Sequence, residues 1–131
     1  MAAEYDATII VQHDATKLAD RVLNAGDVPA EEYPGCTVFS YLNGPTDQLK
    51  GLSTGRVVLA PGVSPHDPHR HPEEEFMIVA EGTGEIVCGE VVTQVGPGSI
   101  MYCAGNALHG IANTGAVPMT FYWSKWTARG F

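Results

Sequence analysis

Histidine is concentrated in one short stretch of the sequence. Three of the five histidines fall within six residues, in the run His66-Asp67-Pro68-His69-Arg70-His71. On an extended strand alternate side chains point to the same face, so the imidazoles of His69 and His71 would lie side by side. Imidazole is a common metal ligand, and the pair therefore indicates a metal site. A structural or surface role is the alternative, because histidines two positions apart also occur beside turns in proline-rich loops.

A carboxylate and a distant histidine could complete the same site. Glutamates occupy positions 73–75, and a strand that begins at Glu75 would bring this carboxylate alongside the two imidazoles. His109, from a later strand, would give three nitrogen ligands and one oxygen ligand. This set suits one divalent Fe, Mn, Ni, Co, Cu or Zn ion and is poor for Ca or Mg. An acidic cluster such as residues 73–75 is also typical of a solvated turn.

Short strands must position these residues. Fifteen glycines and nine prolines divide the 131 residues into short segments, eight of which have the composition of strands bounded by turns. They are Thr8–Val11, Cys36–Leu42, Arg56–Ala60, Phe76–Ala80, Glu85–Cys88, Val91–Val95, Ser99–Tyr102 and Met119–Trp126. Strands at this density predict an all-β fold, either a barrel or a sandwich.

One helix is expected before these strands. Asp14 can cap a helix over Ala15–Ala25, and a further helical turn is expected over Ala30–Tyr33. We therefore expect residues 1–35 to form an N-terminal arm with a short helix, and residues 36–131 to form the β-barrel. Neither a repeat nor a linker separates the two parts, so together they are expected to make one structural domain.

The net charge limits the classes of partner that this protein can bind, and the cysteines indicate the cellular compartment. Seven Lys and Arg residues against fifteen Asp and Glu residues leave a net charge of −8, which disfavours nucleic acid and anionic membranes as partners. No apolar run approaches the roughly 20 residues that span a bilayer. The three cysteines include no CxxC pair, so a disulfide framework is not expected and a cytoplasmic location is the simplest.

The histidine cluster lies within a longer pattern of glycines and acidic residues. Gly62, His69-Arg70-His71, Glu75 and Gly82 occur in this order. They resemble the first motif of the cupin superfamily, in which a Gly precedes an HxH pair and a Glu and a second Gly follow. The run from Glu75 to Gly82 is also similar to the cupin strand that ends in an EG turn. Gly62 is one residue further from His69 than is usual in the motif.

The second cupin motif has a counterpart later in the chain. Gly98, Cys103-Ala104-Gly105, His109 and Asn113 resemble it in order and approximate spacing. The usual Pro-x-Gly of that motif is Cys-Ala-Gly here, and one extra residue precedes His109. These departures affect the loops and leave the ligand positions in place. The two motifs and the flanking strands extend the resemblance over most of the chain.

The resemblance implies a double-stranded β-helix, or jelly-roll, barrel with one metal inside. His69, His71, Glu75 and His109 would be the ligands, and an octahedral metal would keep two open positions for water or substrate. We expect an enzyme that acts on a small polar molecule, an organic acid or a sugar derivative. Oxygenase, isomerase and lyase chemistry all remain open. A metal-assisted module that binds or senses a small ligand without turnover is the alternative.

A narrower resemblance points to a lyase. The segments Tyr33-Pro34-Gly35, Ala104–Ala107 and Phe121-Tyr122-Trp123 are similar to those of short cupins that cleave dimethylsulfoniopropionate. In those lyases a tyrosine two residues beyond the metal-binding Glu is thought to serve as the base. The corresponding residue is Met77, whose thioether cannot accept a proton at neutral pH. This weakens the lyase hypothesis to a minor alternative.

Further residues are candidates for the pocket. His66 is a candidate catalytic residue as a proton shuttle at the barrel mouth, or else a solvated turn residue. Possible pocket residues, all of which could equally serve in packing or at the surface, are Arg56, Met77, Tyr41, Tyr102, Cys103, Tyr122 and Trp123. Cupins commonly pair, so a homodimer is also expected.

Overall fold

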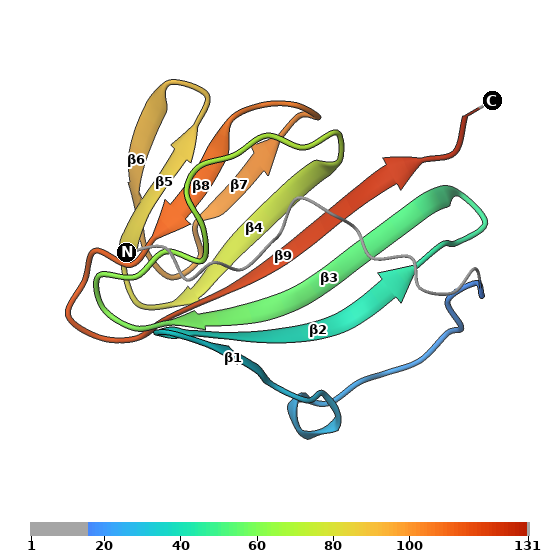
Figure 1. Cartoon of the computed structure of the whole chain (residues 1–131), viewed down its shortest axis with the longest axis horizontal. Helices are drawn as coiled ribbons and strands as arrows, with labels where there is room; N and C mark the ends of the chain where they lie inside the picture. The colour runs from blue at the N-terminus through green and yellow to red at the C-terminus, as the bar shows by residue number, and fades with distance from the viewer. Residues whose placement is uncertain (1–15, 131) are drawn as a thin grey trace.

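The computed structural model describes residues 16–130 as an almost entirely β-structured protein (Figure 1). A short 3₁₀ helix, η1 (Ala25–Asp27), precedes nine strands. The strands are β1 (Glu31–Tyr33), β2 (Cys36–Gly44), β3 (Leu49–Leu59), β4 (Glu74–Glu81), β5 (Gly84–Cys88), β6 (Val91–Val95), β7 (Ile100–Cys103), β8 (His109–Ala112) and β9 (Met119–Ala128). Within the described residues, no helix is long and apolar enough to cross a membrane.

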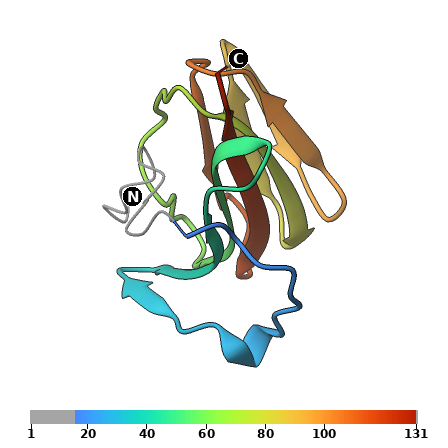
Figure 2. The ribbon, with the colours of Figure 1, turned by 90° about the vertical axis from the view of Figure 1, so that its right-hand side faces the viewer.

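Two antiparallel sheets form a jelly-roll barrel. The larger has the strand order β1-β2-β3-β9-β4-β7, and the smaller has the order β6-β5-β8. Figures 1 and 2 show the smaller sheet beside β4 and β7, while β1 and β2 lie at the other side of the larger sheet. Ile86 and Ile111 of the smaller sheet share one buried core with Val57, Met77 and Phe121 of the larger. The fold class predicted from the sequence is therefore confirmed.

Strand β9 shows how the alternation of side chains builds the interior. Met119, Phe121, Trp123 and Lys125 are buried, whereas Tyr122 between them is exposed. Because alternate residues of a strand face opposite sides, the buried set lines the barrel interior. β9 lies between β3 and β4 at the centre of the larger sheet, so its inward residues reach the middle of the barrel.

The helix predicted over Ala15–Ala25 is wrong for the part that the structure describes. Residues 16–24 have no helical turn. The main-chain N–H of Leu18 donates to Pro45 O at 2.9 Å, and the Leu18 side chain lies against Gly44. Val22 is 86% exposed, so this part of the segment is not packed against the barrel, and packing of an apolar face is what stabilises most helices in proteins. Contacts with the β2–β3 turn therefore replace the helix.

The other differences concern strand boundaries. The helical turn expected over Ala30–Tyr33 is wrong, since Glu31–Tyr33 is strand β1, which pairs with β2 around a turn at Gly35 (φ +69°). β3 begins at Leu49, earlier than the expected strand, and β8 was not among the eight expected segments, although His109 was expected to lie on a later strand. The expected strand Thr8–Val11 and the capping residue Asp14 lie outside the described residues.

A glycine in β3 is required by the packing of the core. A Cβ atom on Gly55 would overlap the indole of Trp123 and the carbonyl oxygen of Phe39. We expect Gly55→Ala to lower the free energy of unfolding by about 2 kcal/mol or more, because overpacking a closed core forces the backbone and the indole apart. Urea unfolding monitored by Trp fluorescence measures this change.

The matched control is Gly26→Ala, where a Cβ would meet nothing within 4 Å. Its free energy of unfolding should stay within about 0.5 kcal/mol of the parent value. Equal stabilities of the two variants would contradict the packing argument.

Candidate metal centre

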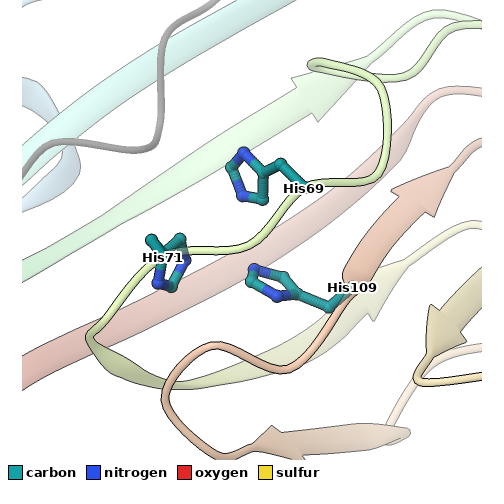
Figure 3. A group of neighbouring side chains, drawn as sticks. All are labelled: His69, His71 and His109. Carbon is teal, nitrogen blue, oxygen red and sulfur yellow. The ribbon is translucent and has the colours of Figure 1, made fainter.

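Two backbone segments bring the three histidines together. The extended segment that contains His69 and His71 runs antiparallel to the start of β8, and His69 forms an isolated β-bridge with His109. The N–H of each bridge residue donates to the carbonyl of the other at 3.0 Å. Figure 3 shows the three imidazoles converging from these two segments. The proximity of His109 to the HxH pair is thus built into the main chain.

The imidazoles form a compact group at this point. Ring centroids are 5.1 Å apart for His69 and His71, 4.8 Å for His69 and His109, and 4.6 Å for His71 and His109. One nitrogen from each ring lies within 4.8 Å of the others, so this triad could hold a metal ion. His71 and His109 are buried and His69 is half-buried. The site therefore sits inside the barrel wall with one ring toward the mouth.

Glu75 at the start of β4 faces two of the three rings. Its Oε1 lies 2.9 Å from Nε2 of His71 and 3.0 Å from Nε2 of His109. Two ligand atoms, each about 2.1 Å from one metal and at right angles to each other, are about 3.0 Å apart. The separations within this group thus fit neighbouring positions around a single ion.

The opposite ring nitrogens explain why a cation suits this arrangement. Nδ1 of His71 lies 3.1 Å from the carbonyl of Glu73, and Nδ1 of His109 lies 3.0 Å from that of Ala107. A carbonyl only accepts, so both Nδ1 atoms carry a hydrogen, and in the neutral form each ring would direct its Nε2 lone pair toward the Glu75 carboxylate. Lone pairs facing an anion repel unless a proton or a metal ion lies between them. The donor set therefore fits a metal.

For His69 and Glu75 the electrostatics favour the protonation states that metal ligands require. Burial and the neighbouring rings of His66, His109 and His71 lower the pKa of His69 to about 3, so this ring is neutral. Burial acts to raise the pKa of Glu75, but hydrogen bonds with His109 and His71 outweigh it and hold the pKa at about 2. This carboxylate is therefore ionised at neutral pH.

The raised pKa of His109 indicates that this site favours a positive charge. Burial opposes protonation of this ring, but hydrogen bonds with the side chains of Cys103 and Glu75 raise its pKa to about 10. Protein that contains no metal would thus hold a proton between His109 and Glu75. A metal ion would replace that proton, as metal binding generally does.

Glu73 is a second buried carboxylate near the site. Its Oε1 lies 3.3 Å from Nδ1 of His71 and has no hydrogen-bond partner within residues 16–130. Glu73 is buried, which the interpretation of residues 73–75 as a solvated turn did not predict. A carboxylate beside the Nδ1–H of a ligand imidazole raises the basicity of its Nε2.

A cavity with a volume of about 30 Å³ opens beside the group. It has room for about one or two water molecules. Its lining residues are Val57, Pro65, His66, Glu75, Met77, His109, Gly110, Ile111, Phe121, Trp123 and Lys125. His66 stacks on His69 with ring centroids 3.8 Å apart, and burial lowers the pKa of His66.

The pocket residues suggested by the sequence fall into two groups in the structure, one in or near the cavity and one on the outer face. Met77 and Trp123 line the cavity, and Cys103 is buried and hydrogen-bonded to His109. Arg56 and Tyr41 are not among the residues that line this cavity. Arg56 lies over the Phe39 ring, with its Cζ 3.9 Å from the centroid, and its Nε donates to the Tyr41 hydroxyl at 3.3 Å. These groups are on the outer face, because the adjacent inward position of β3 is the buried Val57.

The two remaining tyrosines also point outward. Tyr102 is 57% exposed and donates its hydroxyl to Glu74 Oε1 at 2.6 Å, and Tyr122 is 40% exposed. Neither of these tyrosines lines the cavity. In β9 the inward neighbour of Tyr122 is Trp123, and the next inward residue is Lys125, which the sequence interpretation missed. The alternation Met119, Phe121, Trp123, Lys125 was the signal that could have found it.

Comparisons with known proteins agree with this geometry. A family described as the cupin domain matches residues 55–125, which span β3 to most of β9 and include all the residues of the candidate metal centre. No curated protein matches the sequence.

Solved structures extend the likeness to the fold. An RmlC-like cupin from Shewanella frigidimarina superposes with a TM-score of 0.70 at 14% identity, covering 87% of this chain and 96% of that one. A structure described as a sugar phosphate isomerase from a cupin superfamily, from Silicibacter pomeroyi, gives 0.67 at 20% identity, with 84% and 76% covered. A predicted oxalate decarboxylase from Thermotoga maritima gives 0.68 at 19% identity, with 82% and 99% covered. The two cupin motifs, the jelly-roll barrel and the domain match together show that this chain belongs to the cupin superfamily.

Proposed function

We propose that this cupin binds one divalent transition metal through His69, His71, His109 and Glu75 and uses it to act on a small polar molecule. The observation that carries the proposal is that the Nε2 atoms of His71 and His109 lie 2.9 Å and 3.0 Å from one carboxylate oxygen of Glu75. The imidazole and carboxylate ligands are compatible with Fe, Mn, Ni, Co, Cu or Zn. When bound, such a metal would act as a Lewis acid on an oxygen of the substrate or lower the pKa of a bound water.

An organic acid or a sugar derivative is the proposed substrate, and the protein is proposed to be an enzyme. The descriptions of two structural neighbours, a sugar phosphate isomerase and a predicted oxalate decarboxylase, name one molecule of each class. In this chain His66 lies beside the metal group and lines the cavity. Its imidazole is the proposed group for moving a proton at the mouth.

A module that binds a ligand without turnover is the second candidate. The observation that favours it is the apolar wall formed by Met77, Ile111, Phe121 and Trp123. These side chains exclude water and offer no proton acceptor. Met77 lies on the inner face two residues after Glu75, and its thioether at this position continues to disfavour the lyase that uses a tyrosine base.

Metal binding is tested by a pair of matched substitutions at adjacent positions. Glu75→Gln removes the anionic ligand, so we expect the affinity for Co²⁺ or Zn²⁺ to fall at least tenfold, because carboxylate is replaced by a weaker neutral donor. Metal content after equilibrium dialysis, measured by mass spectrometry, gives the result. The parent protein should retain about one equivalent of metal.

Glu74→Gln is the control for this pair. The Glu74 side chain accepts a hydrogen bond from Tyr102 on the outer face, so this variant should bind metal like the parent protein. Equal metal binding by the parent protein and both variants would show that Glu75 is not a ligand.

Turnover separates the enzyme from the binding module. We expect metal-loaded protein to convert at least one compound from a panel of small carboxylates and sugar phosphates, with product followed by NMR and oxygen uptake recorded for the iron form. Chelation should abolish the conversion, since the metal supplies the electrophile. Saturable, metal-dependent binding with no product from any compound would favour the binding module.

The homodimer and the cytoplasmic location stay predictions. Light scattering of the purified protein at micromolar concentration should give twice the chain mass of 13.9 kDa. A mass equal to that of one chain would remove the dimer.

A further inference from the structure

A lysine is buried beside the candidate metal centre. Lys125 is 2% exposed and lines the same cavity as Glu75, His66 and His109. In the β4–β9 ladder it pairs directly with Glu75. It is the only lysine or arginine among the described residues that line this cavity. The metal ligands and one fixed positive charge thus share a single small space.

The position of Lys125 is unfavourable for structure alone. Lys is almost never fully buried, because removing an ammonium group from water is costly even when it is paired. The three inward residues before it in β9 are Met119, Phe121 and Trp123, all apolar. A fourth apolar residue would continue the core, so a lysine here calls for a function at the cavity.

The charges of the site add up in favour of an anion. With neutral imidazoles, ionised Glu75 contributes one negative charge, which Lys125 alone balances. The positive charge of Lys125 also helps to lower the pKa of Glu75 and of His66, so it is felt throughout the site. A divalent metal would give the metal, Glu75 and Lys125 a net charge of about +2, or about +1 when the buried carboxylate of Glu73 beside His71 is counted, in surroundings where electrostatic interactions are strong.

The dimensions and the walls limit what this anion can be. A volume of about 30 Å³, which is room for about one or two water molecules, limits what enters the cavity to a group as small as a carboxylate. The walls below the metal end are apolar, as Met77, Phe121 and Trp123 show. A ligand with one charged head and a short body fits these surroundings.

We propose that Lys125 is the residue that selects the ligand, binding the carboxylate of a small organic acid next to the metal. This inference rests on the proposed function and goes beyond it, because it chooses the organic acid over the sugar derivative and assigns the choice to one side chain. The Lys125 ammonium donates to one carboxylate oxygen, which a neutral ligand cannot match in strength.

Glycolate and its neutral analogue glycolamide test the inference. Isothermal titration of the Co²⁺-loaded protein should give at least tenfold tighter binding of glycolate. Lys125→Met keeps most of the length of the side chain without its charge, so glycolate should bind at least tenfold more weakly and glycolamide should be unaffected. Lys125→Arg should retain most of the preference. Inorganic phosphate binding more tightly than glycolate would overturn the assignment to a carboxylate.

Lys50→Met is the matched control, since Lys50 lies on β3 with an exposed side chain. It should bind both compounds like the parent protein. If Lys125 only neutralises Glu75, Lys125→Met will bind glycolate within twofold of the parent affinity, and the proposal fails. Should that variant not fold, the proposal fails if the parent protein shows no preference for glycolate or if folded Lys125→Arg binds glycolamide equally well.

Failure of the proposed function gives a different result. If the parent protein takes up no Co²⁺, metal dependence is refuted, and the same titrations in the presence of a chelator decide the role of Lys125. Glycolate should then still raise the unfolding temperature of the parent protein more than that of Lys125→Met. An equal shift for both proteins would refute the role of Lys125 as well.

Discussion

The carboxylate of Glu75 is held against two imidazole nitrogens whose partner nitrogens are already committed to main-chain carbonyls. His71 and His109 cannot turn their N–H groups toward Glu75 without breaking the bonds to Glu73 and Ala107. The buried carboxylate of Glu75 would destabilise the barrel unless a proton or a metal ion balanced its charge. The extended HxH segment, the turn before β4 and the start of β8 all have to hold their positions for this contact to exist.

The interior of the larger sheet is divided into a polar row and apolar rows. By the strand register, Cys103, Glu75, Lys125 and Ser53 lie side by side across β7, β4, β9 and β3. The next inward row contains Met101, Met77, Trp123 and Gly55, of which the first three form part of the core. Polar chemistry is thus confined to one end of the barrel, while the rows beyond it supply the packing that holds that end in place.

How much of this could be predicted from the sequence differs from element to element. The barrel and the grouping of His69, His71 and His109 follow from strand alternation together with the two motifs. The arm does not, because Leu18 is held by Pro45 and Gly44, far away in the sequence. The outward position of Arg56 and the inward position of Lys125 could not be predicted from the sequence, for the same reason. The register of a strand determines which of its faces is inward. Pairing with the neighbouring strands sets this register, and the pairing is known only from the structure.

The bridge between His69 and His109 determines how well the metal ligands are ordered before a metal ion binds. Because each of these residues donates its amide to the carbonyl of the other, the main chain around them is ordered when the barrel closes. The entropic cost of gathering the donors is therefore met during folding, and capture of an ion adds little further ordering. Such preorganisation is typical of a centre that exchanges its ion while the scaffold stays intact, unlike a zinc finger, which collapses when its ion is lost.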